Sequence, residues 1–165
     1  MSRNRIVMTA VTGMFAAFAA LTAFSQQLIT QKEVSADMAL AVARGALDKC
    51  RSDGYHVSVT VINSSNILKV AIRDDGTAIG TIDLSRRKAF TALNYRKTSA
   101  EQVKIWNSMP QPVYIPEGAA PSAGGIPIKL GNEVIGAVGV SGAPGGDKDE
   151  ACANAGVAKI ADKLK

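Results

Sequence analysis

Metal-binding and nucleophilic side chains are scarce in this sequence. Its 165 residues include one histidine and two cysteines, and aromatic residues make up 5% of the chain. Structural zinc sites use four Cys or His ligands, and these residues are too few to supply them. A catalytic triad would depend on His56 alone, and no nucleophile elbow is present. The composition therefore indicates neither a zinc protein nor a conventional hydrolase.

Long basic tracts are missing as well. The formal net charge is +5, and it falls to +3 if the first 25 residues, which hold Arg3 and Arg5, are removed. Nucleic-acid-binding domains usually gather Lys and Arg on one face or in one run. This mildly basic chain does not indicate a nucleic-acid partner, and its apolar content of 47% is that of one globular domain.

The first 25 residues have the pattern of a secretory signal peptide. Arg3 and Arg5 form a basic start, residues 6–24 are uncharged, and Ala23 and Ser25 are small residues at the positions that signal peptidase reads. The pattern predicts cleavage after Ser25, which leaves a single domain of residues 26–165 in the periplasm or outside the cell. The alternative is an uncleaved membrane anchor through residues 6–24, a run nearly long enough to span a bilayer.

The first half of the mature chain predicts a helix and then a hairpin. Thr30 and Glu33 fit a capping box, and an apolar stripe at helical spacing runs from there to Asp53-Gly54. The stripe consists of Ala36, Leu40, Ala43, Leu47 and Cys50. Alternating residues then predict a half-buried strand over 57–62 and a second strand over 68–73, with a polar turn between them.

Two helices are expected next. The segment 82–95 predicts a helix with Arg86, Arg87 and Lys88 on its exposed side, and a capping box at Thr98 opens a short helix that ends near Trp106. Prolines at 110, 112 and 116 then predict an extended, irregular connection.

The last third predicts a hairpin and a final helix. Strands over 126–130 and 133–141 flank the turn Gly131-Asn132, and the second strand is apolar on both faces, which is typical of a central strand. The final helix is expected to begin near Asp147, with a core stripe of Ala153, Val157, Ile160 and Leu164. Short hairpins instead of crossovers predict an α+β fold with an antiparallel sheet flanked by helices.

Six glycines lie between Gly124 and Gly142, and they raise the question of a ligand site. Neither a Rossmann fingerprint nor a P-loop is present, and Gly136, Gly139 and Gly142 lie along a strand. Glycines within a strand indicate close approach by a backbone, a helix or a ligand. Gly124 and Gly125 are candidates for a pocket mouth. The segment 142–146 leaves free amides at a helix N-terminus, where an anion such as a carboxylate would bind, and a flexible joint with an ordinary cap is the alternative.

Three segments resemble a known family. They are "DGTAIGTIDLSRRKAFTAL", "GGIPIKLGNEVIGAVGVSG" and "DKDEACANAG", and they are similar to the GlcG/HbpS family, which includes the C-terminal domain of PduO-type proteins. The likeness covers about residues 30–164. It implies a profilin-like antiparallel sheet with helices on both faces, and homo-oligomers from dimers to octamers. It also implies haem as cofactor, and, for exported HbpS-like members, haem sensing or scavenging with a sensor kinase partner.

The resemblance directs attention to residues able to contact haem. His56, the only histidine, is the candidate iron ligand on chemical grounds, with a surface histidine as the alternative. The resemblance places Thr98 against the haem, although its capping role also explains it. Tyr95 and Met109 are nearby alternatives that are more often packing residues.

Further candidates would hold the acid groups of a ligand. Arg73, Arg87 and Lys88 are cations able to pair with haem propionates, and a solvated basic face is the alternative. Gly124, Gly125 and Ser141 would line the same pocket. If the protein is instead an enzyme or accessory acting on a small hydroxy acid, this pocket near Lys88 would hold the substrate carboxylate. No set of catalytic residues is evident, so binding without turnover is the first hypothesis and a structural oligomer the third.

The two cysteines leave one further question open. Cys50 and Cys152 fall on predicted helices near either end of the domain, and export would place them in an oxidising compartment. They either form a disulfide or remain two small buried residues that never meet, because sequence alone does not fix the geometry.

Overall fold

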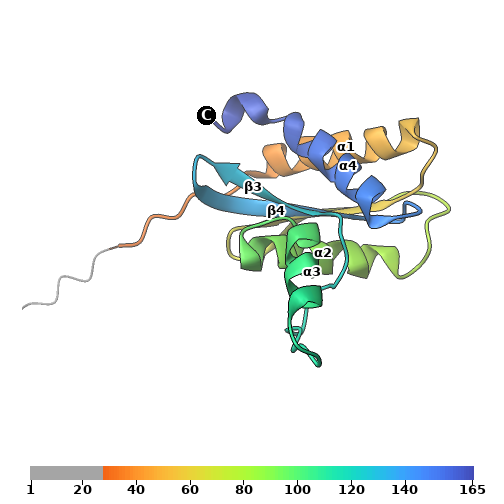
Figure 1. The fold of residues 1–165 in the computed structure, drawn as a ribbon. Helices are drawn as coiled ribbons and strands as arrows, with labels where there is room; N and C mark the ends of the chain where they lie inside the picture. Colours follow the sequence, from red (N-terminus) through yellow and green to blue (C-terminus); the bar gives the residue numbers. More distant parts are fainter. Residues whose placement is uncertain (1–27) are drawn as a thin grey trace, which may run out of the picture. The chain divides into compact units, whose positions relative to one another are not determined.

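The computed structural model describes residues 28–165, and residues 31–165 form one compact unit. The proposed signal peptide lies outside the described residues. The described part contains four α-helices, a short 3-10 turn and one four-stranded antiparallel sheet. The strand order is β2 (Leu68–Arg73), β1 (Ser58–Asn63), β4 (Glu133–Ser141), β3 (Gly125–Leu130). Figure 1 shows helices α1 (Ala36–Ser52) and α4 (Gly146–Ala158) on one face of the sheet and α2 (Thr81–Tyr95) on the other. The predicted α+β fold, an antiparallel sheet with helices on both faces, is confirmed.

Two hairpins build the sheet. β1 (Ser58–Asn63) pairs with β2 (Leu68–Arg73), and β3 (Gly125–Leu130) pairs with β4 (Glu133–Ser141). β1 and β4 then pair antiparallel in the middle of the sheet, which confirms the central place of β4. Every residue of β1 is buried, so the expectation of a half-buried strand is wrong. Helix α2 covers the polar side of β1, where the hydroxyls of Ser58 and Thr60 form hydrogen bonds with the hydroxyls of Thr81 and Ser85, respectively.

Helix α1 (Ala36–Ser52) begins later than the sequence indicates. Its N-cap is Ser35, whose hydroxyl accepts from the amide of Met38, so the capping box at Thr30 is wrong. Glu33 instead binds the side chains of Asn63 and Lys69, and this tertiary contact keeps the segment extended. The stripe is correct from Ala43 onward, but Leu40 is exposed and Ala39, Val42 and Ala46 are buried in its place.

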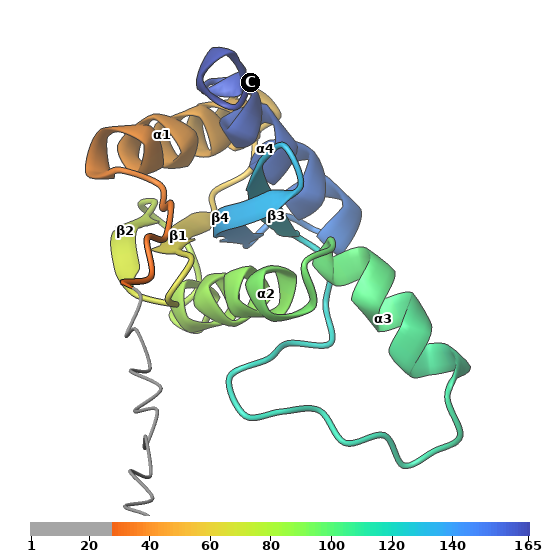
Figure 2. The same ribbon diagram turned by 90° about the vertical axis from the view of Figure 1, so that its left-hand side faces the viewer.

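Helices α2 and α3 follow the predicted ranges closely, whereas the last helix ends at Ala158, so that Ile160 and Leu164 of its expected core stripe lie beyond it. α2 spans Thr81–Tyr95, and α3 spans Ser99–Ser108 with the capping box of Thr98 and Glu101 formed as expected. α4 spans Gly146–Ala158, and the turn Ala161–Lys163 follows it. In the other view, α3 and the connection after it project away from the sheet (Figure 2).

Gly125 in β3 and Gly139 in β4 let helix α2 lie close to the sheet. A Cβ on Gly139 would collide with the carbonyl oxygen of Ser85 and would lie 2.6 Å from the backbone nitrogen of Ala89. A Cβ on Gly125 would likewise strike the backbone of Lys88. The neighbour that requires these glycines is therefore the backbone of α2, so the hollow expected beside them for a ligand is filled by the protein itself.

The two cysteines meet between α1 and α4. Cys50 and Cys152 form a disulfide with a Cα–Cα distance of 5.5 Å, and both residues are fully buried. The bond joins two helices that pack on the same face of the sheet and closes a sequence separation of 102 residues. Within residues 28–165, no helix has both the length and the apolar character required to cross a membrane.

Candidate functional site

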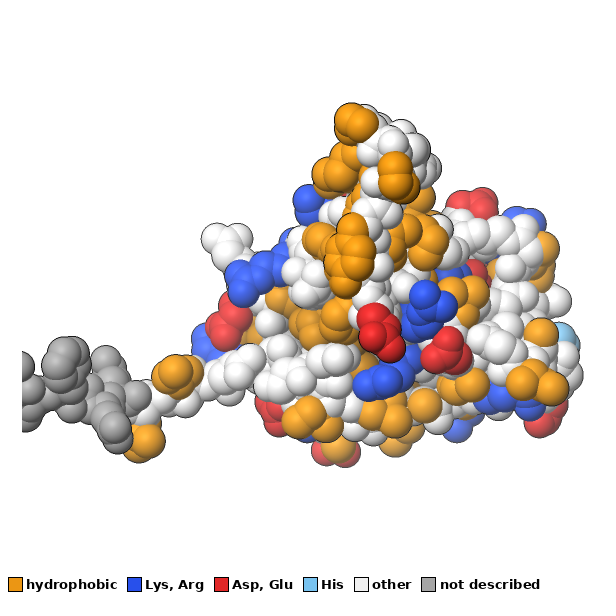
Figure 3. All heavy atoms as spheres, turned by 90° about the horizontal axis from the view of Figure 1, so that it is seen from below, with side chains coloured by type: hydrophobic (Ala, Val, Ile, Leu, Met, Phe, Trp, Pro, Cys, Tyr) orange, Lys and Arg blue, Asp and Glu red, His pale blue; other side chains and the backbone are white. Residues whose placement is uncertain are grey.

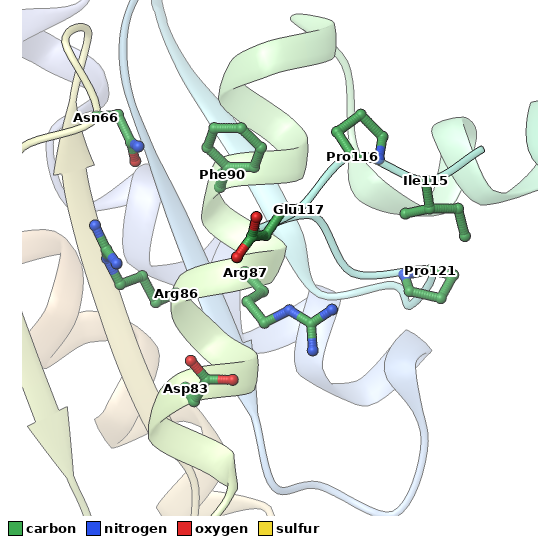
Figure 4. A pocket seen from close by; sticks show the side chains of 10 residues that line it. Asn66, Asp83, Arg86, Arg87, Phe90, Ile115, Pro116, Glu117 and Pro121 are labelled. Atoms are coloured by element: carbon green, nitrogen blue, oxygen red, sulfur yellow. The ribbon is translucent and has the colours of Figure 1, made fainter.

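An open groove lies along the outer face of α2. Its volume is about 680 Å³, and its other wall is the connection that leads from α3 to β3. Figure 4 shows Phe90 on α2 across from Asn66 of the β1–β2 turn and Arg86 extending toward the neighbouring strand, while Arg87 points to the other side, where the connection runs. The lining residues are Asn66, Asp83, Arg86, Arg87, Phe90, Ile115, Pro116, Glu117, Gly118 and Pro121.

Helical spacing places one wall of this groove. Arg86 and Arg87 are three and four residues after Asp83, and Phe90 is four and three residues after them, so these side chains share the face of α2 that points away from the sheet. The opposite face carries small residues such as Ala89 and Ala92, which let α2 lie close to the strands. Arg86 and Arg87 are therefore exposed, and Phe90 is half-buried between them and the connection.

The second wall is held to α2 by hydrogen bonds. The guanidinium of Arg87 donates to the carbonyl oxygen of Ala119 at 3.1 and 2.7 Å, and the amide of Ala120 donates to the hydroxyl of Thr91 at 2.9 Å. These contacts fix the connection beside the helix, and its prolines keep it extended. Ile115, Pro116 and Pro121 thus present apolar surface across from Phe90.

The groove carries charges of both signs. Among the described residues, none of the ion pairs includes Arg86 or Arg87, so neither guanidinium is neutralised by a carboxylate within 4.0 Å. Asp83 and Glu117 also line the groove. Figure 3, which views the side of α2 and α3, shows blue and red side chains together beside a projection that is rich in apolar side chains. Met109 and Tyr114, in the segment that follows α3, are exposed.

Lys88 lies elsewhere, and its predicted exposure is wrong. It is 2% exposed, and its Nζ donates to the carbonyl oxygen of Val140 at 3.0 Å and to Asp149 Oδ2 at 2.7 Å. The ion pair links α2 to α4 past the end of the sheet. Burial raises the pKa of Asp149, and the contact with Lys88 opposes that rise. Lys88 is thus neutralised within the protein.

The other residues expected around that pocket are buried too. Gly124 and Gly125 have no room for a side chain, since Lys88, Asp149 and Ser99 lie against them. Ser141 is 2% exposed at the end of β4. The structure brings Gly124 and Lys88 together as predicted, but as part of the packing between α2, β4 and α4. Gly124, Gly125, Ser141 and Lys88 are all absent from the lining of the groove.

His56 belongs to a separate cluster at the start of β1. Its Nδ1 lies 3.2 Å from Asp74 Oδ2, and the guanidinium of Arg51 donates to the same carboxylate at 2.6 Å. The hydrogen bonds from Arg51 are the main reason that the pKa of Asp74 is lowered to about 2. Arg73 donates to the carbonyl oxygen of Thr77 nearby. The imidazole is mostly exposed, and it is not among the residues that line the groove.

The remaining candidates surround helix α3. Thr98 caps α3 through its hydroxyl, and Tyr95 packs edge-on against Trp106 with ring centroids 5.4 Å apart. Met109 is the C-cap of α3 and is 44% exposed. None of the three lines the groove.

Sequence reasoning missed most of the groove. Arg87 was the one groove residue among the candidates, whereas Phe90, Arg86 and Asn66 were not considered. The spacing of Arg86 and Phe90 on the outer face of an amphipathic helix is a signal that could have found them. The proline-rich connection offers no periodicity that would place it beside α2.

The fold and groove define a small α+β domain with an open groove of apolar and cationic side chains. A family model described as "Haem degrading protein HbpS-like" matches residues 34–158. The chain belongs to the HbpS-like family, and the resemblance to GlcG/HbpS proteins is confirmed. No curated protein sequence matches it.

Solved structures agree with this assignment. The crystal structure of HbpS is 34% identical with a TM-score of 0.76, and the match covers 80% of this chain and 93% of that one. A doubly substituted HbpS from Streptomyces reticuli is 31% identical with a TM-score of 0.76, over 94% of this chain and 97% of that one. A PduOC–haem complex, 18% identical with a TM-score of 0.72 over 78% and 96% of the two chains, shares the fold.

Proposed function

We propose that this protein binds haem in the groove between α2 and the connection 115–121. The observation that carries the proposal is the combination of facing apolar surfaces with two arginines that have no carboxylate partner. Phe90, Ile115 and Pro116 would pack against a flat macrocycle and Arg86 would bind a propionate, while Arg87 adds positive charge and holds the connection through the carbonyl oxygen of Ala119. Membership of the HbpS-like family and the haem complex of PduOC support the choice of ligand.

The wider setting forms part of the proposal. We infer an exported protein, because the sequence carries a signal-peptide pattern and the disulfide suits an oxidising compartment. Its assembly as a homo-oligomer is proposed from the family resemblance. Haem sensing or scavenging would follow from binding at such a location. The alternative, a carboxylate site for a hydroxy acid beside Lys88, finds no support because Asp149 already occupies the ammonium group.

A haemin titration of the mature protein tests the proposal. We expect a shifted Soret band with saturable binding, and a weakening of about three- to tenfold in Arg86→Ala, since the lost charged hydrogen bond is exposed to solvent. Phe90→Ala should weaken binding by a similar factor through lost stacking. Arg44→Ala is the matched control, because Arg44 is exposed on α1 across the sheet.

Two results would contradict the proposal. Absence of binding at micromolar haemin would remove it, and equal losses in Arg44→Ala and Arg86→Ala would move the site away from the groove. The same titration detects haem breakdown, which the family description names. Turnover would make the Soret band decay with time in the presence of a reductant and oxygen.

A further inference from the structure

A second hollow continues the groove past Phe90. It has a volume of about 290 Å³ and lies between the β1–β2 turn and the second half of α2. Asn66 and Phe90 line both hollows, so the two form one elongated site with a junction at these residues. The second hollow is lined by Gln31, Ser64, Asn66, Phe90, Leu93, Asn94, Arg96 and Val134.

The two hollows differ in charge. The first contains Arg86 and Arg87 together with Asp83 and Glu117, whereas Arg96 is the single charged residue that lines the second. Arg96 is exposed at the end of α2, where Ser64 and Asn94 add polar side chains. The carboxylates of Asp83 and Glu117 would repel an acid group in the first hollow. The second hollow, which contains Arg96, is therefore the more favourable place for an acid group of a ligand.

Asn66 stands at the junction with an unused hydrogen-bonding atom. Its Oδ1 is buried and has no partner among the described residues, and its backbone is fixed at a φ of +61° in the turn. A buried amide oxygen without a partner costs free energy that a bound donor or an ordered water would recover. This atom can accept a hydrogen bond only from a donor, and an ordered water that also donates to an acid group of a ligand would supply one at the place where the hollows meet.

The lining also lacks the side chains that hold iron. Haem iron is bound in proteins by His, Cys, Met or Tyr, and within residues 28–165 no side chain of these types lines either hollow. His56 belongs to the Asp74 cluster and lines neither hollow. The lining side chains can contact the rim and the faces of a macrocycle, but none of them is of a type that coordinates haem iron.

We propose that this site recognises an acid-bearing tetrapyrrole by its periphery and not by its iron. The inference rests on the proposed function and names the ligand class more narrowly. The side chains of Phe90 and Ile115 would pack against the macrocycle. Arg86 and Arg96 would bind its two acid groups, one on each side of Asn66. Metal-free and metal-bearing forms of the macrocycle are then bound alike.

Fluorescence and absorbance titrations of the full mature protein test this inference. The probes are haemin, protoporphyrin IX, zinc protoporphyrin and the dimethyl ester of protoporphyrin IX. We expect the first three to bind with Kd values within about threefold of each other, and the ester to bind at least tenfold more weakly because its acid groups are blocked. Arg96→Ala should weaken the acid forms several-fold and leave the ester unchanged, and Glu117→Gln should tighten the acid forms by about twofold.

The outcomes separate this inference from the proposed function. Haemin binding with protoporphyrin IX at least tenfold weaker would overturn the inference alone, as would loss of haemin binding in His56→Ala but not in Arg86→Ala. Failure of every tetrapyrrole to bind would overturn both. Unchanged thermal unfolding of each variant, measured without ligand, shows that a weakened Kd reports the site and not the fold.

Discussion

At the scale of single residues, the buried pair of Lys88 and Asp149 shows how an apparent surface lysine becomes structural. An ammonium group buried to this degree needs a partner, and Asp149 supplies it from 61 residues further along the chain. Asp149 Oδ1 in turn accepts from the amide of Ala143, so the carboxylate also holds the entry to α4. The pair joins the helices on opposite faces of the sheet.

Removing the lysine should therefore destabilise the fold. We expect Lys88→Met to lower the free energy of unfolding by about 3–5 kcal/mol, because it leaves a buried carboxylate unpaired. Asp149 would then have a raised pKa in the folded state alone, so the loss should be smaller at pH 5 than at pH 8. Urea unfolding at both pH values measures this.

Two variants control this prediction. Lys104→Met, an exposed lysine on α3, should change stability by less than about 0.5 kcal/mol. Adding Asp149→Asn to Lys88→Met should recover part of the loss, since the charge is removed and the contact to Ala143 is kept. Equal effects of Lys88→Met and Lys104→Met would mean that the buried pair contributes nothing specific.

Asp74 predicts a different dependence on pH. Its pKa is lowered from 3.8 to about 2, first by the hydrogen bonds from Arg51. A carboxyl whose folded pKa is lowered contributes stability above its unfolded pKa and loses it as pH falls through the folded value. The wild-type protein should thus lose about 1–2 kcal/mol between pH 4 and pH 2 through this group, allowing for the solvent around Arg51.

The substitution Asp74→Asn tests whether Asp74 causes this loss of stability at low pH. The variant should be less stable than the wild type at pH 6, and its stability should fall less steeply between pH 4 and pH 2 in urea unfolding. Asp75→Asn, at the exposed neighbouring position, should retain the wild-type slope. A wild-type slope in Asp74→Asn would place the acid sensitivity in another carboxyl.

At the scale of elements, the contact between α2 and the sheet depends on the absence of side chains. Gly139 lies where the backbone of α2 crosses β4, and a Cβ there meets the carbonyl oxygen of Ser85 and the nitrogen of Ala89. Both obstacles are backbone atoms of a helix, which cannot rotate away as a side chain can. This contact determines the position of the groove, because the outer face of α2 forms one of its walls.

Gly139→Ala should therefore displace α2. We expect a loss of about 3 kcal/mol or more in the free energy of unfolding, at the upper end of overpacking effects. Haemin binding should weaken as well, since Arg86 and Phe90 move with the helix. Gly80→Ala is the matched control, because no atom lies within 4 Å of a Cβ at that position and its φ is −74°. Comparable losses in the two variants would refute the packing argument.

At the scale of the whole molecule, local patterns were sufficient for most of the architecture. Alternation and hairpin turns predicted all four strands, and the apolar character of β4 on both faces placed it centrally. The start of α1 was missed because Glu33, which completes a capping box in sequence, bonds instead with Asn63 and Lys69. A competing tertiary contact of that kind leaves no local signal.

The candidate site was much less predictable than the fold. Glycine spacing indicated that something approaches β4, but only the assembled structure shows that it is α2 and not a ligand. The burial of Lys88 depends on Asp149, which is remote in sequence. The groove needs a wall from residues 115–121, whose position follows from hydrogen bonds to Arg87 and Thr91 and not from any periodic pattern.

The last prediction concerns the mature molecule as the cell makes it. If residues 1–25 are a signal peptide, the exported protein begins at Gln26 and carries Cys50 and Cys152 as a disulfide, which requires an oxidising compartment. Intact-mass measurement of the periplasmic or secreted fraction should give the chain 26–165 with no free thiol. Ala23→Leu should block cleavage and retain the longer chain at the membrane. A full-length chain at the membrane in the wild type would favour the anchor through residues 6–24, and free thiols in a cytoplasmic fraction would contradict export altogether.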